Sequence, residues 1–310
     1  MALQGKAAAL GKTLMNTARW QISSSMLMGL TSAFSSVVDY AKELNESLNN
    51  IRIVTGKTQE DMAKFAKTAN ESAKALSAST TEYTNAALIY YQQGLSDKEV
   101  KERTNTTIKL ANAVGKDAEA VSEWMTAIWN NFDDGSESLE YYADVLAKLG
   151  AATASSADEI AGGLEKFSAV ADTVGLSYEY AASALATITA ETRQSEEVVG
   201  TALKTIFARV ENLKLGETLE DGTNLGQYSA ALAKVGVNIQ ESNGNLRDMD
   251  SILSDIGARW ETLNKSEQVA LAQSVAGIRQ YNQFIALMDN WDVMERNLEL
   301  TEEANGALEL

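Results

Sequence analysis

Apolar residues recur at steps of three and four along nearly the whole chain, and this spacing predicts helices. One such stripe runs from Ser195 to Leu213, another runs from Asp248 to Leu263, and a third begins at Glu119. The tryptophans within these stripes are explained as core residues, so no cofactor box is needed to account for them. We predict an all-α fold, a multi-helix array of roughly a dozen helices joined by short turns.

Local residues mark where many of these helices begin and end. A Ser or Thr followed three residues later by an acid can form a capping box, in which side chain and backbone satisfy each other's free groups. Four such pairs are Thr58–Asp61, Ser79–Glu82, Ser96–Glu99 and Ser156–Glu159. Glycines near the ends of the apolar stripes are expected to close helices in the left-handed conformation. They are Gly56, Gly94, Gly115, Gly150, Gly175 and Gly236.

One stretch departs from the helical pattern. Residues 236–240 alternate between apolar and polar, and Asn243-Gly244 offers a turn with positive φ before Leu246. This predicts one small β-hairpin over about residues 237–246. The preceding segment 216–226 is predicted to be a polar loop.

The sequence also repeats itself weakly. Residues 79–83 resemble residues 156–160, and Gly94-Leu95-Ser96 recurs as Gly175-Leu176-Ser177, a period of about eighty residues. Two related helical units stacked in tandem would follow. We therefore divide the chain into an N-terminal helical segment that extends or packs on partners, a first unit, a second unit with the loop and hairpin, and a tail marking a fragment boundary. These parts are 1–50, 51–150, 151–300 and 301–310.

Three residue types are missing from the composition. The chain has no proline, where average usage would give about fifteen, and this suits long or repacking helices. Without cysteine and histidine it has no disulfides, no thiolate or imidazole metal ligands, and no Ser-His-Asp or Cys-His catalytic arrangement. The net charge of −17 opposes binding to nucleic-acid phosphates and anionic membranes.

One uncharged stretch has nearly the length of a membrane span. It runs from Trp20 to Val38, and its seven serines and threonines make it too polar for a transmembrane helix. The composition favours a helix that packs against partner helices.

The sequence predicts no catalytic residues, no cofactor-binding residues and no metal ligands. Gly162-Gly163 lies within a helical pattern, where close helix packing explains it better than phosphate binding. The acidic loops 133–137 and 220–224 fail the EF-hand template, because apolar residues fall on ligand positions. We interpret both loops as solvated and expect neither cofactors nor an enzyme.

Five blocks follow one another in a recognisable order. The first two blocks, at 49–58 and 91–96, contain Val54-Thr55-Gly56 and Gln93-Gly94-Leu95-Ser96. The later blocks are 196–209 with Gly200-Thr201-Ala202-Leu203, 236–248 with the predicted hairpin, and 276–284 with Ala276-Gly277-Ile278-Arg279-Gln280. In this order they make the chain similar to the core region of phage tail tape measure proteins, the minor tail protein family of long-tailed phages.

This resemblance implies a structural role. Family members are long helical chains in the lumen of the tail tube that scaffold its assembly, help set tail length and leave when DNA is ejected. It implies as partners the tail tube protein, tail assembly chaperones, tail tip or baseplate proteins and other copies of the chain. The resemblance also implies contact with the host membrane during ejection. It does not imply stable binding to nucleic acid. The implied location is the virion tail tube lumen, and the host cytoplasm during assembly.

Two other functions are weighed against this one. A pore-forming or injected helical effector would use Trp20 to Val38 to insert into a membrane. A muralytic module would make the chain an enzyme. The glycine-punctuated helices also favour a packed helical unit over one continuous rod, with any pure ruler elsewhere in a longer parent chain.

Overall fold

The computed structural model describes residues 24–241 and 245–309, with side chains from residue 39 to 308 outside that gap. Within these residues the chain forms thirteen α-helices and one short 3-10 turn, which confirms the prediction of a predominantly helical fold. Their bounds are α2 Ser24–Thr55, α3 Gln59–Ala75, α4 Thr80–Gln92, α5 Asp97–Val114, α6 Ala118–Phe132, α7 Leu139–Ala152, α8 Ala157–Val174, α9 Tyr178–Thr192, α10 Glu196–Lys214, α11 Leu225–Lys234, α12 Met249–Trp260, α13 Lys265–Asp289, α14 Trp291–Glu302 and η1 Ala307–Glu309.

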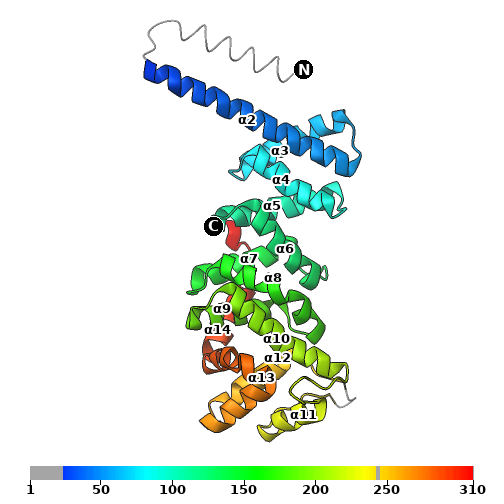
Figure 1. The fold of residues 1–310 in the computed structure, drawn as a ribbon, viewed down its shortest axis with the longest axis vertical. Coiled ribbons are helices and arrows are strands. Elements are labelled where there is room, and N and C mark those ends of the chain that lie inside the picture. The colour runs from blue at the N-terminus through cyan, green and yellow to red at the C-terminus, as the bar shows by residue number, and fades with distance from the viewer. Residues whose placement is uncertain (1–23, 242–244, 310) are drawn as a thin grey trace.

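The helices build an elongated array of two facing stacks (Figure 1). In one stack α2, α4, α6, α8, α10 and α13 each pack on the next. In the other, α5, α7 and α9 pack in order, and α3 lies at one end against α4. Because the chain passes from one stack to the other with each helix from α2 to α10, successive helix pairs add length. This is the architecture of an α-solenoid.

The repeating element is a helix pair. The N-cap residues of α3, α5, α7 and α9 are spaced by 38, 42 and 39 residues, at Thr58, Ser96, Ser138 and Ser177. Those of α4, α6, α8 and α10 are spaced by 38, 39 and 39 residues, at Ser79, Asp117, Ser156 and Ser195. The echo in the sequence therefore spans two such pairs.

Helix starts follow the predicted caps. Thr58 and Ser96 form capping boxes with Asp61 and Glu99, respectively. Ser79 accepts a hydrogen bond from the Glu82 N–H, without the reciprocal bond that would complete a box.

Of the predicted glycine ends, Gly150 is the exception. It lies inside α7 with an ordinary helical conformation. A Cβ at this position would stand 2.5 Å from the Ala157 backbone nitrogen. Gly150 therefore permits the close approach of α7 and α8 and does not end a helix, which corrects the prediction.

The C-terminal helices fold back along the array. α13 packs on α10, and α14 then runs over α9 and α7, so that η1 reaches α7 and α5 (Figure 1). The buried carboxylate of Asp144 on α7 accepts hydrogen bonds from the backbone N–H groups of Gly306 and Leu308, at 2.9 and 2.8 Å. This carboxylate fixes the end of the returning strap, by which we mean α14 and η1.

The predicted β-hairpin is not confirmed as two strands. The described residues of this segment form one isolated antiparallel bridge between Gln240 and Leu246, and the turn at 242–244 lies outside them. Val237 and Ile239 are both buried. The alternating apolar residues that predicted a strand are therefore side chains buried in the helical core.

The stretch from Trp20 to Val38 lies outside the residues whose side chains the structure describes. Among the helices that are described, none has the length and apolar character needed to span a bilayer.

Candidate functional site

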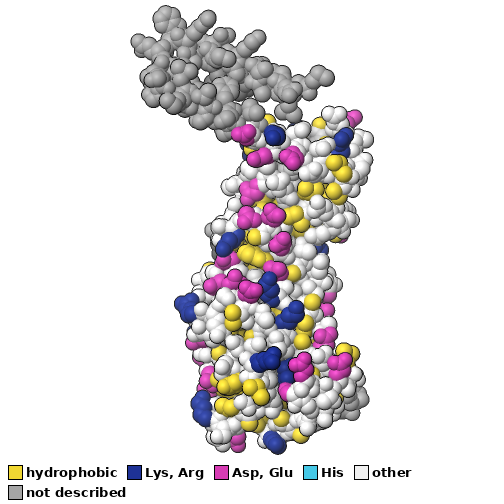
Figure 2. Space-filling model, in the orientation of Figure 1, with side chains coloured by type: hydrophobic (Ala, Val, Ile, Leu, Met, Phe, Trp, Pro, Cys, Tyr) yellow, Lys and Arg dark blue, Asp and Glu magenta, His cyan; other side chains and the backbone are white. Residues whose placement is uncertain are grey.

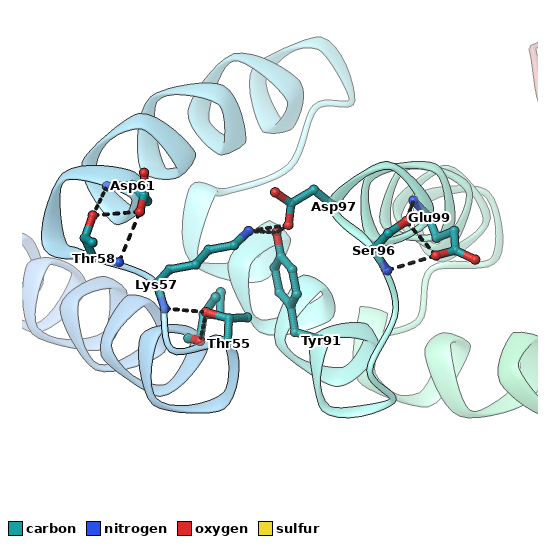
Figure 3. Close-up of polar contacts among 9 residues, drawn as sticks. Thr55, Lys57, Thr58, Asp61, Tyr91, Ser96, Asp97 and Glu99 are labelled. Atoms are coloured by element: carbon teal, nitrogen blue, oxygen red, sulfur yellow. Dashed lines mark hydrogen bonds and ion pairs between the residues drawn. The ribbon is translucent and has the colours of Figure 1, made fainter.

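Two turns from the first two sequence blocks meet at one end of the array (Figure 3). One turn connects α2 to α3, and Thr58 and Asp61 cap the helix that follows it. The other connects α4 to α5, where the Glu99 carboxylate accepts the Ser96 N–H at 2.8 Å. Each turn is fixed locally by its cap, so the side chains between the helices have defined positions.

Lys57 bridges the two turns. Its ammonium group forms an ion pair with Asp97 and donates to the Tyr91 hydroxyl at 3.4 Å, while lying 4.8 Å from the centre of the Tyr91 ring. The Tyr91 hydroxyl in turn donates to Asp97 Oδ1 at 3.0 Å. We call these three residues the Lys57 cluster.

The protonation states of the Lys57 cluster suit a structural contact between the two turns and not a catalytic role. The hydrogen bond from Lys57 lowers the pKa of the Asp97 carboxyl, with a further contribution from Tyr91. Burial raises the pKa of the Tyr91 phenol, and the bonded Asp97 carboxylate raises it further. The phenol therefore stays a neutral donor to an ionised carboxylate, and the arrangement clamps the α2–α3 turn to the start of α5.

A cleft of about 440 Å³ opens beside the cluster, between α3 and α5. Its floor is apolar and includes Phe65 and Tyr91, whose rings meet edge to face at 5.8 Å, together with buried Val100. Five charged residues of both signs also line it: Lys57, Lys64, Lys101, Asp61 and Asp97. No site was predicted at these residues from the sequence.

The signal that would have found this site is the helix-pair period. Lys57 immediately precedes the N-cap of α3, and Asp97 immediately follows the N-cap of α5, the next helix in the same stack. In a solenoid, residues one repeat apart lie on neighbouring helices. A period of one helix pair would have placed Lys57 and Asp97 together, whereas the detected echo of two pairs does not.

The third block lies on α10 and contacts α8 through glycines. A Cβ at Gly200 would stand 2.6 Å from the carbonyl oxygen of Gly163, and a Cβ at Gly163 would stand 2.5 Å from Leu185. The prediction that Gly162-Gly163 serves close helix packing is confirmed at Gly163.

The fifth sequence block, residues 276–284, contacts the end of the third block, residues 196–209, at Arg209. Gly277 interrupts α13 with φ 75° and ψ 167°, and a Cβ there would stand 3.0 Å from Arg209 Nη1. The mostly buried Arg209 side chain forms an ion pair with Asp221 at 2.8 Å. The kink and the missing side chain at Gly277 together make room for this guanidinium group.

The two acidic loops differ from each other. Asp134 is exposed and accepts the Ser136 N–H, which lowers its pKa, in keeping with a solvated loop. Asp221 instead joins its loop to α10, because hydrogen bonding to Thr223 and the ion pair with Arg209 both lower its pKa. Within the described residues, no group of three or more potential metal-binding acids converges.

Comparison with known proteins gives two matches of different kinds. Residues 66–277 match the family model described as phage-related minor tail protein. The chain is also similar to a tape measure protein of Pneumococcus phage Dp-1, with 20% identity over 263 residues. That alignment covers 85% of this chain and 22% of the relative, so the chain spans about a fifth of the relative's length. No solved structure matches the chain.

Proposed function

The chain belongs to the phage-related minor tail protein family, and from this premise we propose that it is a packed helical segment of the scaffold on which a tail tube assembles. The observation that carries the proposal is the family match over about two thirds of the chain. Membership makes the chain a structural tail protein of the virion that contacts other tail components, and not an enzyme.

In the proposed role the segment lies in the lumen of the tail tube, contributes to tail length and leaves when DNA is ejected. The elongated solenoid supports this, because stacked helix pairs add length without widening the molecule (Figure 1). The acidic surface supports it too. Figure 2 shows one face on which acidic side chains are spread along most of the length. Such a surface repels the phosphates of DNA passing through the lumen.

The proposed partners are the tail tube protein, assembly chaperones, tail tip or baseplate proteins and further copies of the chain. Assembly would begin in the host cytoplasm, and contact with the host membrane would occur during ejection. These partners follow from the family resemblance and not from a particular surface of the molecule.

We further propose that the two related units are residues 58–132 and 138–214, each made of two helix pairs. The N-caps of α3 to α6 recur in α7 to α10 after 80, 77, 81 and 78 residues. The division first drawn between residues 150 and 151 falls inside α7, which packs as one helix.

Deleting one unit tests the scaffold role. Removal of residues 58–137 joins Lys57 to Ser138, so one N-cap residue replaces another. In phage carrying this deletion we expect shorter tails by electron microscopy. The change should be about 20 Å if the helices stay packed, and about 120 Å if eighty residues form one extended helix.

Duplication of the same unit is the matched control, since it should lengthen tails by the same amount. Together the two variants separate a change in length from a general assembly defect. Normal tails of unchanged length in both variants would show that this segment does not contribute to tail length.

A further inference from the structure

The C-terminal strap contacts helix pairs that are not its neighbours along the chain. In a solenoid each repeat normally contacts only the next one, so small rotations between repeats add up to bending of the whole array. Here α13 packs on α10 and α9, the strap continues over α9 and α7, and η1 ends on α7 and α5 (Figure 1). The segment from α13 to η1 therefore touches three successive helix pairs, α5 with α6, α7 with α8, and α9 with α10.

Polar contacts anchor the strap on two of these pairs separately. On α9, the buried Thr187 hydroxyl accepts a hydrogen bond from the buried Asn297 amide at 3.0 Å. On α7, the buried Asp144 carboxylate accepts the N–H groups of Gly306 and Leu308. Because these anchors lie at different points along the strap, the length of strap between them limits how far α7 and α9 can move apart.

The strap is also fixed where it begins. Trp291 is buried, and its indole ring lies over Gly257 of α12, where an added Cβ would stand 2.1 Å from the ring. Met294, one helical turn further on, is fully buried. A single residue, Asn290, connects the strap to α13. The strap is therefore held at both ends and cannot slide along the array.

The N-terminal end of the array lacks this bridge. Among the described residues, the strap makes no comparable contact with α2, α3 or α4. Between α3 and α5 the stack is open at the cleft. The Lys57 cluster joins these helices at one end, and the Asn112 side chain donates to the Leu76 carbonyl at 2.6 Å at the other. The molecule thus contains a bridged part, from α5 to α10, and an unbridged part, from α2 to α4.

We propose that the strap is a brace that holds the helix pairs from α5 to α10 at a fixed spacing and orientation, and that its release lets these pairs move relative to one another. Release begins at η1, because the anchor there consists of one carboxylate and two backbone N–H groups. This conformational role goes beyond the proposed scaffold role. It is a property of the isolated chain, so its failure would leave the scaffold role untouched.

Distances between spin labels test the brace in the full chain. The chain has no cysteine, so pairs of introduced cysteines carry the labels, and double electron–electron resonance gives the distribution of distances between them. The pair E123C/K204C connects exposed positions on α6 and α10, across α8. The pair E46C/E123C connects exposed positions on α2 and α6, across α4, and serves as the reference outside the bridge.

Two variants release the strap from opposite sides. Asp144→Ala removes both acceptors from α7. Gly306→Pro removes one donor from the strap, and proline cannot adopt the φ of 80° found there. In each variant we expect faster hydrogen exchange over residues 291–309. The α6–α10 distribution should become about 1.5-fold wider, because the freed repeats can rotate against one another, and the α2–α6 distribution should stay the same. Asp292→Asn, on the exposed side of α14, is the matched control and should change neither distribution.

Three outcomes would overturn the brace. Faster exchange in the strap with an unchanged α6–α10 distribution would show that the helix pairs keep their spacing without it. Equal broadening of both distributions would show a general loss of structure. Unchanged exchange in both variants would show that these anchors do not hold the strap. If Asp144→Ala does not fold, Gly306→Pro decides, since residue 306 lies between α14 and η1 and outside the two stacks.

Discussion

Single residues in the contact between α8 and α10 decide how closely these helices approach. Gly200 lies over the Gly163 carbonyl with no space for a Cβ. A Cβ at Gly162 would meet the flexible Glu196 side chain at 3.1 Å and Trp124 Nε1 at an ordinary contact distance of 4.0 Å. Alanine is favoured over glycine inside a helix by about 0.8–1.0 kcal/mol. Whether a glycine-to-alanine substitution raises or lowers stability therefore depends on the space available for the added methyl group.

We predict opposite outcomes for two glycine substitutions. Gly200→Ala should destabilise the chain by about 1–3 kcal/mol, the usual cost of overpacking. Gly162→Ala should leave stability unchanged or raise it slightly. Urea denaturation of both variants measures the difference, and equal effects would show that close packing at Gly200 is not required.

Asp250 makes folding stability depend on pH with a sign opposite to that of the capping carboxylates. Burial raises the pKa of its carboxyl group, although the Ser177 N–H bonds to it at 3.0 Å. An acid whose pKa is raised by folding favours the folded state most below its unfolded pKa, and that contribution is lost as pH rises through the folded pKa.

For Asp250→Asn we therefore predict higher stability than the wild type at neutral pH, because the amide cannot ionise and its oxygen still accepts from Ser177. The advantage should shrink as pH falls toward the unfolded value of about 3.9. Urea midpoints between about pH 3 and 8 test this sign. A difference that stays constant with pH would rule out ionisation of Asp250 as its cause.

At the level of helices, residues adjacent in the chain determine where a helix begins, whereas packing against other helices determines its kinks and close contacts. The caps at Thr58 and Ser96 were readable from two residues each, because a cap involves only neighbours in the chain. The kink at Gly277 was not readable in this way. The space beside Gly277 is filled by the Arg209 side chain, which comes from another helix.

The strap offers an element-scale prediction at Asp144. The carboxylate accepts two backbone N–H groups while only 4% exposed. In Asp144→Asn, one oxygen becomes an amide nitrogen that donates and cannot accept. Because hydrogen bonds to charged groups contribute about 1.5–3 kcal/mol, we expect a loss of that order and faster hydrogen exchange at Gly306 and Leu308.

Asp292→Asn on the exposed side of α14 is the matched control, since its ion pair with Arg296 is solvated. It should change stability by less than about 0.5 kcal/mol. If the exchange rates at residues 306 and 308 are the same in both variants, Asp144 does not hold the strap.

At the scale of the whole molecule, the solenoid predicts a shape between a globule and a rod. A compact chain of this length has a radius of gyration of about 19 Å, and an unfolded one about 60 Å. A single helix of all its residues would be about 465 Å long. Small-angle X-ray scattering should therefore give a folded particle with a radius above about 19 Å and a maximum dimension far below the length of that helix. A value at the globular expectation would contradict the stacked arrangement.

The sequence by itself determined the features whose physical causes are local. Apolar spacing predicted the helical fold, Ser and Thr marked helix starts, and Gly162-Gly163 indicated a close helix contact without naming the partner helix. The family resemblance came from ordered blocks, and the family match over residues 66–277 confirms it.

Only the tertiary structure decided which distant residues meet. Lys57 and Asp97 form the ion pair beside the cleft, and Arg209 rests on Gly277, since stacking brings separate helices together. Gly150 was misjudged for the same reason, because its local pattern resembles a helix end but its surroundings come from the neighbouring helix α8. The hairpin predicted over residues 237–246 is not confirmed beyond the single antiparallel bridge. Cap chemistry depends on three or four consecutive residues, whereas packing depends on surfaces that exist only after folding.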